Sequence, residues 1–269
     1  MKPDRVINFA KLSATGNDFI LFDNRDGRFR GEEREFFRDI CQRRFSVGAD
    51  GILLLESSQR HDFSLRYYNS DGSLGEMCGN GARAAAYYAW RHGIAGSTMT
   101  FDVLGVSYEA TIKDNGVNLI MPPPVSIQEF PGVADQADGV EGGYLNVGVP
   151  HYVLFVEDVE LVDVETIGRK YRYHPVFQPW GANVNFVQVL DQNHIKIRTY
   201  ERGVEAETLA CGTGTISAAI LAYRQRAIHV PVTVQARGGQ LRVFFETDMT
   251  KILLEGQAKI VYYGQLIDR

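Results

Sequence analysis

The chain has 269 residues, of which 45% are hydrophobic and 23% charged, so it can bury one large core or two smaller ones. Its formal net charge of -5 excludes the overall basic field that would favour nucleic acid or an anionic membrane. The first 17 residues hold no apolar run of signal-peptide length, and no segment reaches the roughly 18 apolar residues of a membrane span. We therefore expect a cytoplasmic protein whose three cysteines are free thiols rather than a disulfide scaffold.

Local patterns along the chain predict many strands and a few helices. The first part of the chain should form strand, turn and strand over 6–22, with the turn at 15–18, and then a helix over 32–44. Strands follow over 98–121, with a hairpin turn at Asp114-Asn115-Gly116, and a domain boundary is expected at Met-Pro-Pro-Pro 121–124. The last part should form strands over 230–263, with turns at Gly238-Gly239 and Gly256. The pattern as a whole indicates a strand-rich α+β chain.

The strongest signal is an internal repeat. Residues 78–89 and 211–222 both begin Cys-Gly-x-Gly, and six of their twelve positions are identical. The similarity extends upstream, where Leu-Arg-Tyr-Tyr at 65–68 matches Ile-Arg-Thr-Tyr at 197–200. Each half therefore reads as strand, loop, cysteine motif and helix. A repeat of half the chain predicts two similar domains related by a pseudo-twofold axis, with a shared cleft lined twice by the same motif.

Each motif should place a thiol where a helix begins. The two glycines let the backbone turn and approach a ligand closely, and the alanine-rich run that follows Cys78 favours a buried helix. At a helix N-terminus the backbone N–H groups and the helix dipole favour an anion. Such a position can bind a carboxylate, and it lowers a thiol pKa from about 8.5 to ~3.5–7.5. Cys211 repeats this arrangement.

Two such thiols facing one carbon atom could invert it, one as base and the other as acid. A carboxylate held between two helix N-termini would also stabilise a carbanion-like transition state. This chemistry needs neither a metal nor an organic cofactor. The six histidines lack metal-ligand spacing, and the glycine-rich segments lack the βαβ context of nicotinamide binding. Cys41, inside the predicted helix, is expected to be an inert buried thiol.

These motifs resemble the diaminopimelate epimerase family, and the matches run from residue 9 to residue 264. The matching segments are Thr15-Gly-Asn-Asp-Phe19, Asn69-Ser-Asp-Gly-Ser73, Cys78-Gly-Asn-Gly-Ala-Arg83, Tyr200-Glu-Arg-Gly203 and Glu207-Thr-Leu-Ala-Cys-Gly-Thr-Gly214. The resemblance implies an α+β fold of two pseudo-symmetric domains, each a mostly antiparallel, barrel-like sheet around a central helix, with the active site in the cleft between them. The halves would be residues 1–122, joined by a C-terminal strand at 258–269, and residues 123–257.

The activity implied is the epimerisation of LL-2,6-diaminopimelate to the meso form, without pyridoxal phosphate, by proton transfer between the two cysteines. The resemblance also implies a homodimer that acts on a small amino acid, with no nucleic-acid or membrane partner.

The resemblance further implies roles for individual residues. Cys78 and Cys211 would transfer protons, and His151 and Glu201 would tune their pKa values. Arg202 would clamp the distal carboxylate of the substrate, which suits its planar fork. The remaining substrate-binding residues would be Asn17, Asn69, Asn183 and Glu201, with Gly79, Asn80, Gly212 and Thr213 holding the reacting carboxylate by their backbone N–H groups.

Two positions depart from the family pattern. Val149 stands where some members have asparagine, and Gly51 where some have glutamine. Both positions would contact the substrate, so a racemase of another amino acid, such as histidine or glutamate, remains an alternative. A redox-switch or anion-binding protein is an alternative from another class, because glycine loops before helices also hold phosphate. No P-loop lysine follows either motif.

Overall fold

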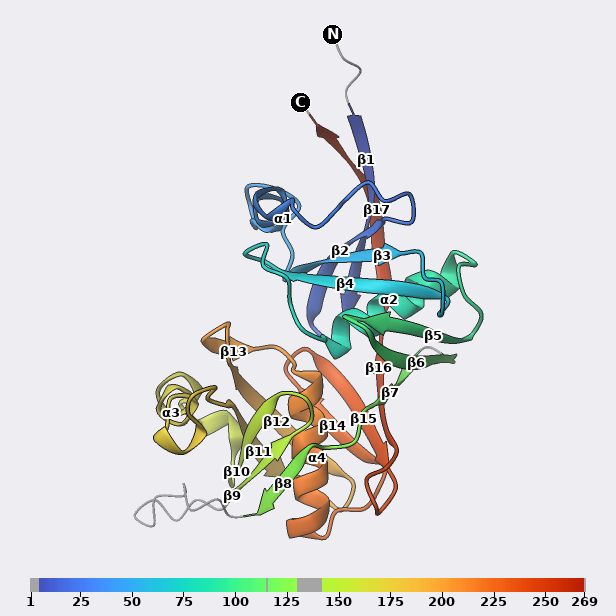
Figure 1. The fold of residues 1–269 in the computed structure, drawn as a ribbon. Helices are drawn as coiled ribbons and strands as arrows, with labels where there is room; N and C mark the ends of the chain where they lie inside the picture. Colours follow the sequence, from blue (N-terminus) through green and yellow to red (C-terminus); the bar gives the residue numbers. More distant parts are fainter. Residues whose placement is uncertain (1–4, 115, 130–141, 269) are drawn as a thin grey trace. The chain divides into compact units, whose positions relative to one another are not determined.

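The computed structural model describes residues 5–114, 116–129 and 142–268, which fold as two compact units (Figure 1). Unit 1 comprises Met1–Leu119 and Gly256–Arg269, and unit 2 comprises Ile120–Glu255, each over its described residues. Asn115 of the predicted hairpin turn lies outside the described residues. Of the helices in the described part of the chain, none has the length and apolar character that a bilayer crossing requires.

Unit 1 is a sheet whose strands are paired in the order β17, β1, β2, β3, β4, β5, β6. The pairs β2–β3 and β4–β5 are parallel and the others antiparallel, with helix α1 between β2 and β3 and helix α2 between β4 and β5. The elements are β1 (Arg5–Ala14), β2 (Asn17–Asp23), α1 (Arg34–Cys41), β3 (Gly51–Glu56), β4 (Phe63–Asn69), α2 (Gly79–Arg91), β5 (Thr98–Val103), β6 (Val106–Lys113) and β17 (Lys259–Asp268).

Unit 2 repeats this connectivity with strands β8, β9, β10, β11, β12, β14 and β15. The pairs β10–β11 and β12–β14 are parallel, α3 lies between β10 and β11 in the chain, and α4 precedes β14. The elements are β8 (Ser126–Glu129), β9 (Gly142–Asn146), β10 (Pro150–Phe155), η1 (Val159–Leu161), α3 (Val164–Arg172), η2 (Pro175–Phe177), β11 (Asn183–Val189), β12 (His194–Glu201), β13 (Ala206–Thr208), α4 (Gly212–Arg226), β14 (Val232–Ala236) and β15 (Gly239–Phe245). Strands β7 (Gly116–Met121) and β16 (Ile252–Gln257) carry the chain between the units.

The predicted fold class is confirmed: two α+β units with the same order of elements, each a mostly antiparallel sheet that packs against a helix. Two local predictions differ from the structure. The helix predicted over 32–44 spans only Arg34–Cys41. Gly256 lies inside β16 rather than in a turn, and it is buried there, so it acts as a small residue within a strand.

The two long helices are the centre of each unit, and many of their buried side chains are small. In α2, alanines 82, 84, 85, 86 and 89 are all buried, and the helix contacts β1, β2, β3, β4, β6 and β17. In α4, residues 214 to 222 are buried without a break, and the helix contacts strands β9 to β12, β14 and β15 (Figure 1). Small side chains let a sheet approach a helix on several sides.

The sheet of unit 1 is covered on both faces. Strand β3 is buried along almost its whole length, as expected of a strand with apolar neighbours above and below. Ile52 and Leu54 pack in a cluster with Phe37 and Ile40 of α1, whereas Leu53 lies beside Gly81 of α2. Successive side chains of β3 therefore point alternately toward the outer helix α1 and the inner helix α2.

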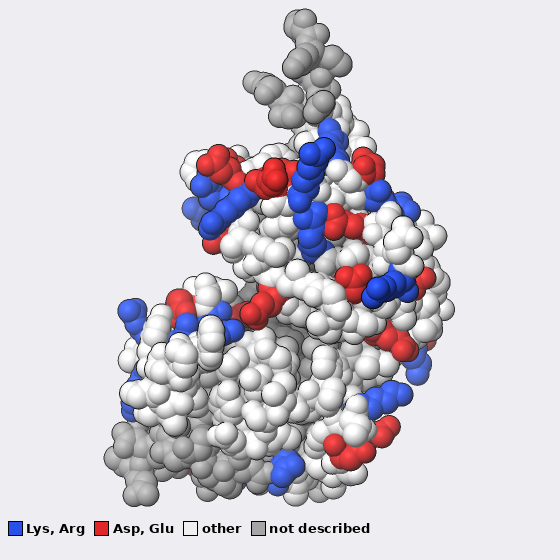
Figure 2. Space-filling view, in the orientation of Figure 1, with Lys and Arg blue, Asp and Glu red and all other residues white. Residues whose placement is uncertain are grey.

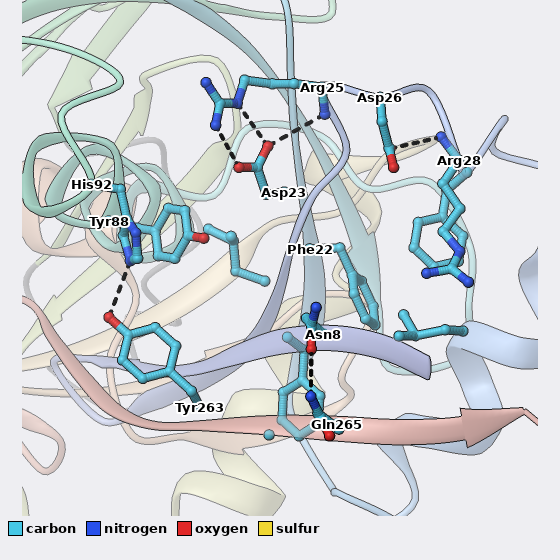
Figure 3. Close-up of a pocket in the computed structure, with 15 residues that line it drawn as sticks. Asn8, Phe22, Asp23, Arg25, Asp26, Arg28, Tyr88, His92, Tyr263 and Gln265 are labelled. Atoms are coloured by element: carbon cyan, nitrogen blue, oxygen red, sulfur yellow. Dashed lines mark hydrogen bonds and ion pairs between the residues drawn. The ribbon is translucent and has the colours of Figure 1, made fainter. Parts of the chain in front are cut away.

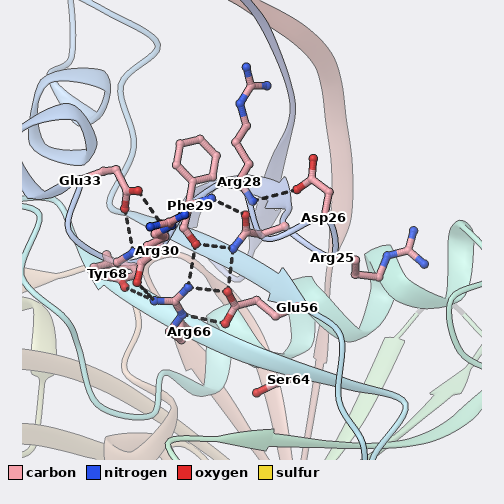
Figure 4. A network of polar contacts seen from close by, with 12 residues as sticks. Arg25, Asp26, Arg28, Phe29, Arg30, Glu33, Glu56, Ser64, Arg66 and Tyr68 are labelled. Carbon is pink, nitrogen blue, oxygen red and sulfur yellow. Dashed lines mark hydrogen bonds and ion pairs between the residues drawn. The ribbon is translucent and has the colours of Figure 1, made fainter.

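An arginine anchors the crossover segment to the sheet in each unit, which explains the Arg shared by the upstream repeats. Arg66 binds both carboxylate oxygens of Glu56 and donates to the carbonyls of Phe29 and Arg30 (Figure 4). Arg198 likewise pairs with Glu207 at 2.7 Å and donates to the carbonyls of Val159 and Val162 at 2.9 Å. On the face of unit 1 seen in Figure 2, basic and acidic side chains intermingle rather than gather by sign.

We expect Arg66→Met to lower the free energy of unfolding by about 2–3 kcal/mol, because it strands a half-buried carboxylate and two carbonyls. The control is Arg25→Met, whose pair with Asp23 is more exposed (45% and 32%) and which should cost about 0.5 kcal/mol or less. Urea unfolding at neutral pH compares the two variants. Equal losses would show that the Arg66 network contributes no more than a surface ion pair.

Candidate active site

In unit 1, Cys78 stands directly at the start of the buried helix α2, as the sequence predicts. It is the N-cap residue, in an extended backbone conformation (φ -111°, ψ 110°), and its sulfur accepts a hydrogen bond from Gly81 N at 3.4 Å. Gly79 and Asn80 form the first turn, where helical N–H groups point toward the helix N-terminus. The thiol is half-buried, so it combines partial access with the positive end of a helix dipole.

Asn80 joins two segments that lie far apart in the sequence. Its amide donates to Asn17 Oδ1 at 2.6 Å, and Asn17 donates in turn to Asp50 Oδ2 at 3.0 Å. The Gly-Asn-Asp-Phe segment and the Val47–Asp50 segment therefore meet at the start of α2. Burial raises the pKa of Asp18, but hydrogen bonds from Arg43 and Lys11 outweigh it and hold that pKa below its usual value.

Arg83 is a functional candidate that the sequence reasoning did not single out. It is fully buried in α2, and it donates to Gly79 O at 3.2 Å, to Thr15 Oγ1 at 3.0 Å and to Asn80 Oδ1. No carboxylate is among its partners in the described part of the chain, and its Nε has no acceptor there. Burial lowers the pKa of Arg83 to about 10, while the neighbouring Cys78 charge acts in the opposite direction.

An unpaired buried cation costs free energy, and an anion nearby would offset that cost. The Arg83 charge therefore favours the thiolate of Cys78 or a carboxylate at the same helix end. The signal in the sequence was an arginine inside an alanine run, at a place where the second repeat has Ile216.

Asn69 and Gly51 are directly opposite each other at the ends of β4 and β3. The Asn69 amide donates to Ser73 Oγ at 3.1 Å, which stabilises the loop toward Cys78. A Cβ atom at Gly51 would lie 2.5 Å from the Tyr67 ring and 2.5 Å from Tyr68 O. The space that a glutamine would enter at this position is thus already occupied by the Tyr67 ring and the backbone of β4.

In unit 2, Cys211 caps α4 as Cys78 caps α2. It is also half-buried and in an extended backbone conformation (φ -121°, ψ 118°). Its sulfur lies 3.5 Å from Thr213 Oγ1, and that oxygen lies 2.9 Å from His151 Nε2. Burial, with a smaller contribution from the Arg202 charge, lowers the pKa of His151 to about 3. His151 is therefore neutral at physiological pH. Its ring can donate and accept hydrogen bonds, but it carries no positive charge.

Asn183 and Arg202 meet where β11 begins and β12 ends. The Asn183 amide donates to Pro150 O at 3.0 Å, and its oxygen accepts from Arg202 N at 2.8 Å. The Arg202 guanidinium donates to Trp180 O at 3.3 Å, while Glu205 binds Arg172 at 2.9 Å. Asn183 thus fixes the backbone from which Arg202 projects. Glu201, half-buried, ends β12 just before it.

The structure brings the predicted residues together within each unit. Cys78, Gly79, Asn80 and Asn17 form one connected group in unit 1, and His151, Thr213 and Cys211 form another in unit 2. Cys41 stands apart from both groups, because burial raises its pKa to about 12 and makes the thiol unreactive. Within the described residues, no group of three or more His, Cys, Asp or Glu side chains is arranged to hold a metal ion.

Solved structures define the fold class to which the chain belongs. A PhzF-family phenazine biosynthesis protein of Bacillus anthracis matches 98% of this chain and 99% of its own, with a TM-score of 0.76 and 15% identity. A hydroxyproline epimerase of Agrobacterium vitis matches 100% and 95%, with a TM-score of 0.69 and 14% identity. The chain therefore has the two-repeat α+β fold that these proteins share.

Sequence relatives define the family within that class. The family model described as diaminopimelate epimerase matches residues 9–127 and again residues 143–261, once per half. Diaminopimelate epimerases of Aquifex aeolicus and Hydrogenobaculum are 42% and 40% identical to this chain, covering 97% and 95% of it and 98% and 97% of their own lengths. The chain belongs to the diaminopimelate epimerase family, which confirms the resemblance seen in the sequence.

Proposed function

We propose that this protein is an isomerase that epimerises LL-2,6-diaminopimelate to the meso form by two-base proton transfer between Cys78 and Cys211. The observation that carries the proposal is that a half-buried cysteine thiol caps the buried central helix at the same place in both halves of the repeat. Family membership supports the substrate. The reaction uses groups of this chain alone, without a metal or an organic cofactor.

The two helix N-termini contribute to binding of the substrate carboxylate and to stabilisation of the charge that forms on it. The reacting carboxylate binds the backbone N–H groups of Gly79 and Asn80 and of Gly212 and Thr213, whose dipoles favour an anion. One cysteine, as thiolate, removes the α-proton, and negative charge spreads onto the carboxylate, where the N–H groups stabilise it. The other cysteine, as thiol, returns a proton to the opposite face of the carbon. The two thiols exchange roles for the reverse reaction.

The substrate pocket depends on the residues beyond the thiols. Arg202 supplies a forked cation for the distal carboxylate, and Asn183 fixes the backbone that carries it. Asn17 and Asn69 are held by Asp50 and Ser73, so their amides are ordered before substrate arrives. Glu201 directly precedes Arg202 at the end of β12, and its carboxylate is assigned to substrate binding as well.

A racemase of another amino acid is the second candidate, because Val149 and Gly51 replace residues that some members use for binding. At Gly51, the Tyr67 ring already fills the space beside the backbone, so loss of a glutamine there does not by itself open a larger pocket. The geometry at Gly51 therefore gives no added room for a different substrate.

Cys78→Ser and Cys211→Ser should each lower turnover by at least about 10³-fold, because a serine hydroxyl is neither base nor acid at neutral pH. Chiral chromatography of the product measures turnover, and ligand-induced thermal shift measures binding, which should persist. Cys41→Ser is the matched control and should keep wild-type activity. A redox-switch or anion-binding protein would instead show no turnover of diaminopimelate even as wild type, so neither cysteine variant would change it.

Arg202→Met should raise KM for diaminopimelate by about 10–100-fold with a smaller change in kcat, since it removes charge-assisted hydrogen bonds to the distal carboxylate. A panel of diaminopimelate, glutamate and histidine, assayed on wild type and variant, measures this. A wild-type preference for histidine, or an Arg202→Met variant with unchanged KM, would favour the racemase alternative.

We propose that the protein acts as a cytoplasmic homodimer. The exposed apolar side chains of unit 1 suit a contact between two copies. Val6 of β1 and Ile267 of β17 are register partners and are 44% and 63% exposed. Beside them lies a hollow at which Tyr88 stacks on His92 and His92 binds Tyr263 (Figure 3). Its lining includes none of the predicted active-site residues, so it is free to serve assembly.

Ile267→Glu should convert the dimer to monomer, because a buried unpaired charge at an interface is costly. Leu161→Glu, at an 84% exposed leucine of unit 2, is the control and should leave the mass unchanged. Light scattering during gel filtration reads the mass. A wild-type monomer, or a dimer insensitive to Ile267→Glu, would refute assembly through this face.

A further inference from the structure

The two halves have the same fold but opposite chemistry beneath their cysteines. In unit 1, β2 pairs Phe19 with Gly51, and β3 pairs Leu53 with Tyr67. In unit 2, the equivalent strands pair His151 with Asn183 and Asn185 with Thr199. The apolar layer of Phe19, Leu53 and Tyr67 in unit 1 therefore corresponds to a polar layer of His151, Asn185 and Thr199 in unit 2.

Contacts with the helices confirm this correspondence. A Cβ atom at Gly81 of α2 would lie 3.0 Å from Leu53 Cδ2, and one at Gly214 of α4 would lie 2.4 Å from Asn185 Oδ1. The two glycines occupy the same place in the Cys-Gly-x-Gly motifs. Asn185 is fully buried directly against the first turn of α4, and burying a polar layer is costly unless every group is hydrogen-bonded.

The direction of the hydrogen bonds in this layer is fixed by Asn185. Its Oδ1 accepts from the Thr199 hydroxyl at 3.0 Å, and its Nδ2 lies 3.2 Å from Tyr152 O, a carbonyl that can only accept. The side-chain amide can therefore be turned only one way. The same Nδ2 lies 3.1 Å from His151 Nδ1, so that ring nitrogen must be the acceptor and carry no proton.

The rest of the chain of donors follows from this assignment. Because His151 is neutral, its single ring proton is on Nε2, which donates to Thr213 Oγ1 at 2.9 Å. The hydroxyl oxygen of Thr213 is then an acceptor from His151, and its own proton is available for Cys211 Sγ, 3.5 Å away. A hydrogen bond donated to a thiolate stabilises the charged form.

We propose that Asn185 is a positioning residue that fixes His151 as its Nε2–H tautomer, so that Thr213 donates a hydrogen bond to the Cys211 thiolate. The proposal rests on the proposed function of Cys211. In it, His151 is a hydrogen-bond donor and not a proton acceptor. The proton taken from the substrate stays on the sulfur of Cys211 and is not passed to the imidazole, whose Nε2 is already protonated and whose Nδ1 is occupied by Asn185.

The two thiols are then adjusted by different means. Cys78 lies near a buried charge, that of Arg83, and its half has the apolar side chains of Phe19 and Leu53 at the equivalent place. Cys211 receives a directed neutral hydrogen bond, and Ile216 stands in α4 where α2 has Arg83.

The tautomer can be observed directly in the free protein. Long-range ¹H–¹⁵N correlation of the histidine rings, with the His151 signals identified by their loss in His151→Gln, should show the Nε2–H form. The Nδ1–H form or a doubly protonated ring at neutral pH would overturn the proposal.

The second measurement is the alkylation rate of Cys211 by iodoacetamide at fixed pH, in a background of Cys41→Ser and Cys78→Ser. Thr213→Val and His151→Phe should each slow alkylation by about tenfold, since each removes the donor that supports the thiolate. Thr213→Ser keeps a hydroxyl and His151→Gln keeps a donor near Nε2, so each should restore most of the rate. Equal rates for Thr213→Val and Thr213→Ser would overturn the proposal, as would a His151→Gln variant as slow as His151→Phe.

Asn185→Leu installs the residue that unit 1 has at this place. It should slow alkylation as His151→Phe does, and combining it with Thr213→Val should add nothing, because both act through one hydrogen bond. Additive effects would mean that Asn185 acts by another route. These readouts need no substrate, so inactivity toward diaminopimelate would refute the proposed function without touching the tautomer, and an Nδ1–H ring in an active epimerase would refute only the role of Asn185.

Discussion

A cysteine that caps the N-terminus of a largely buried helix is the constraint on which the rest of the molecule depends. Helix α2 and helix α4 each begin at a half-buried cysteine, while their sides are covered by strands of their own unit. The buried sides are made of alanine, glycine and apolar residues. At the start of each helix the first backbone N–H groups have no partner within the helix, which favours both a thiolate and a carboxylate there.

The repeat preserves this geometry but not the chemistry around it. Arg66 and Arg198 are structural equivalents that tie equivalent segments to the sheet, so the fold has kept them in both halves. Arg83 and Ile216 occupy the same motif position and differ completely, as do Leu53 and Asn185. We infer that packing requirements hold the halves alike, while the two thiols, in the proposed action on opposite faces of an asymmetric carbon, require different surroundings.

The sequence predicts the features that depend on neighbouring residues. The cysteine motifs, their glycines and the alanine runs are local, so the start of each helix could be predicted and is found at Gly79 and Gly212. The equivalence of the halves was also readable from residues 65–68 and 197–200. Gly256 was misread because a glycine within a strand has the same local pattern as a turn.

Contacts between distant strands could not be predicted in this way. His151 and Asn185 meet because β10 and β11 are parallel neighbours joined through α3, and no local pattern specifies that pairing. The role of Arg83 was hidden for a similar reason, since its partner Thr15 comes from the turn after β1. The candidate site residues could be named from motifs, whereas the residues that orient them could be found only from the fold.

The most direct test of two-base catalysis is the fate of the α-hydrogen during the first turnovers in D₂O. Starting from unlabelled LL-diaminopimelate, mass spectrometry and NMR should find deuterium at the inverted carbon of nearly every meso molecule, while the remaining substrate is still unlabelled. This pattern is predicted because the thiol that returns the hydrogen is not the one that removed it. Meso product that retains the hydrogen of the substrate would mean that a single base acts on both faces, and it would contradict the paired roles of Cys78 and Cys211.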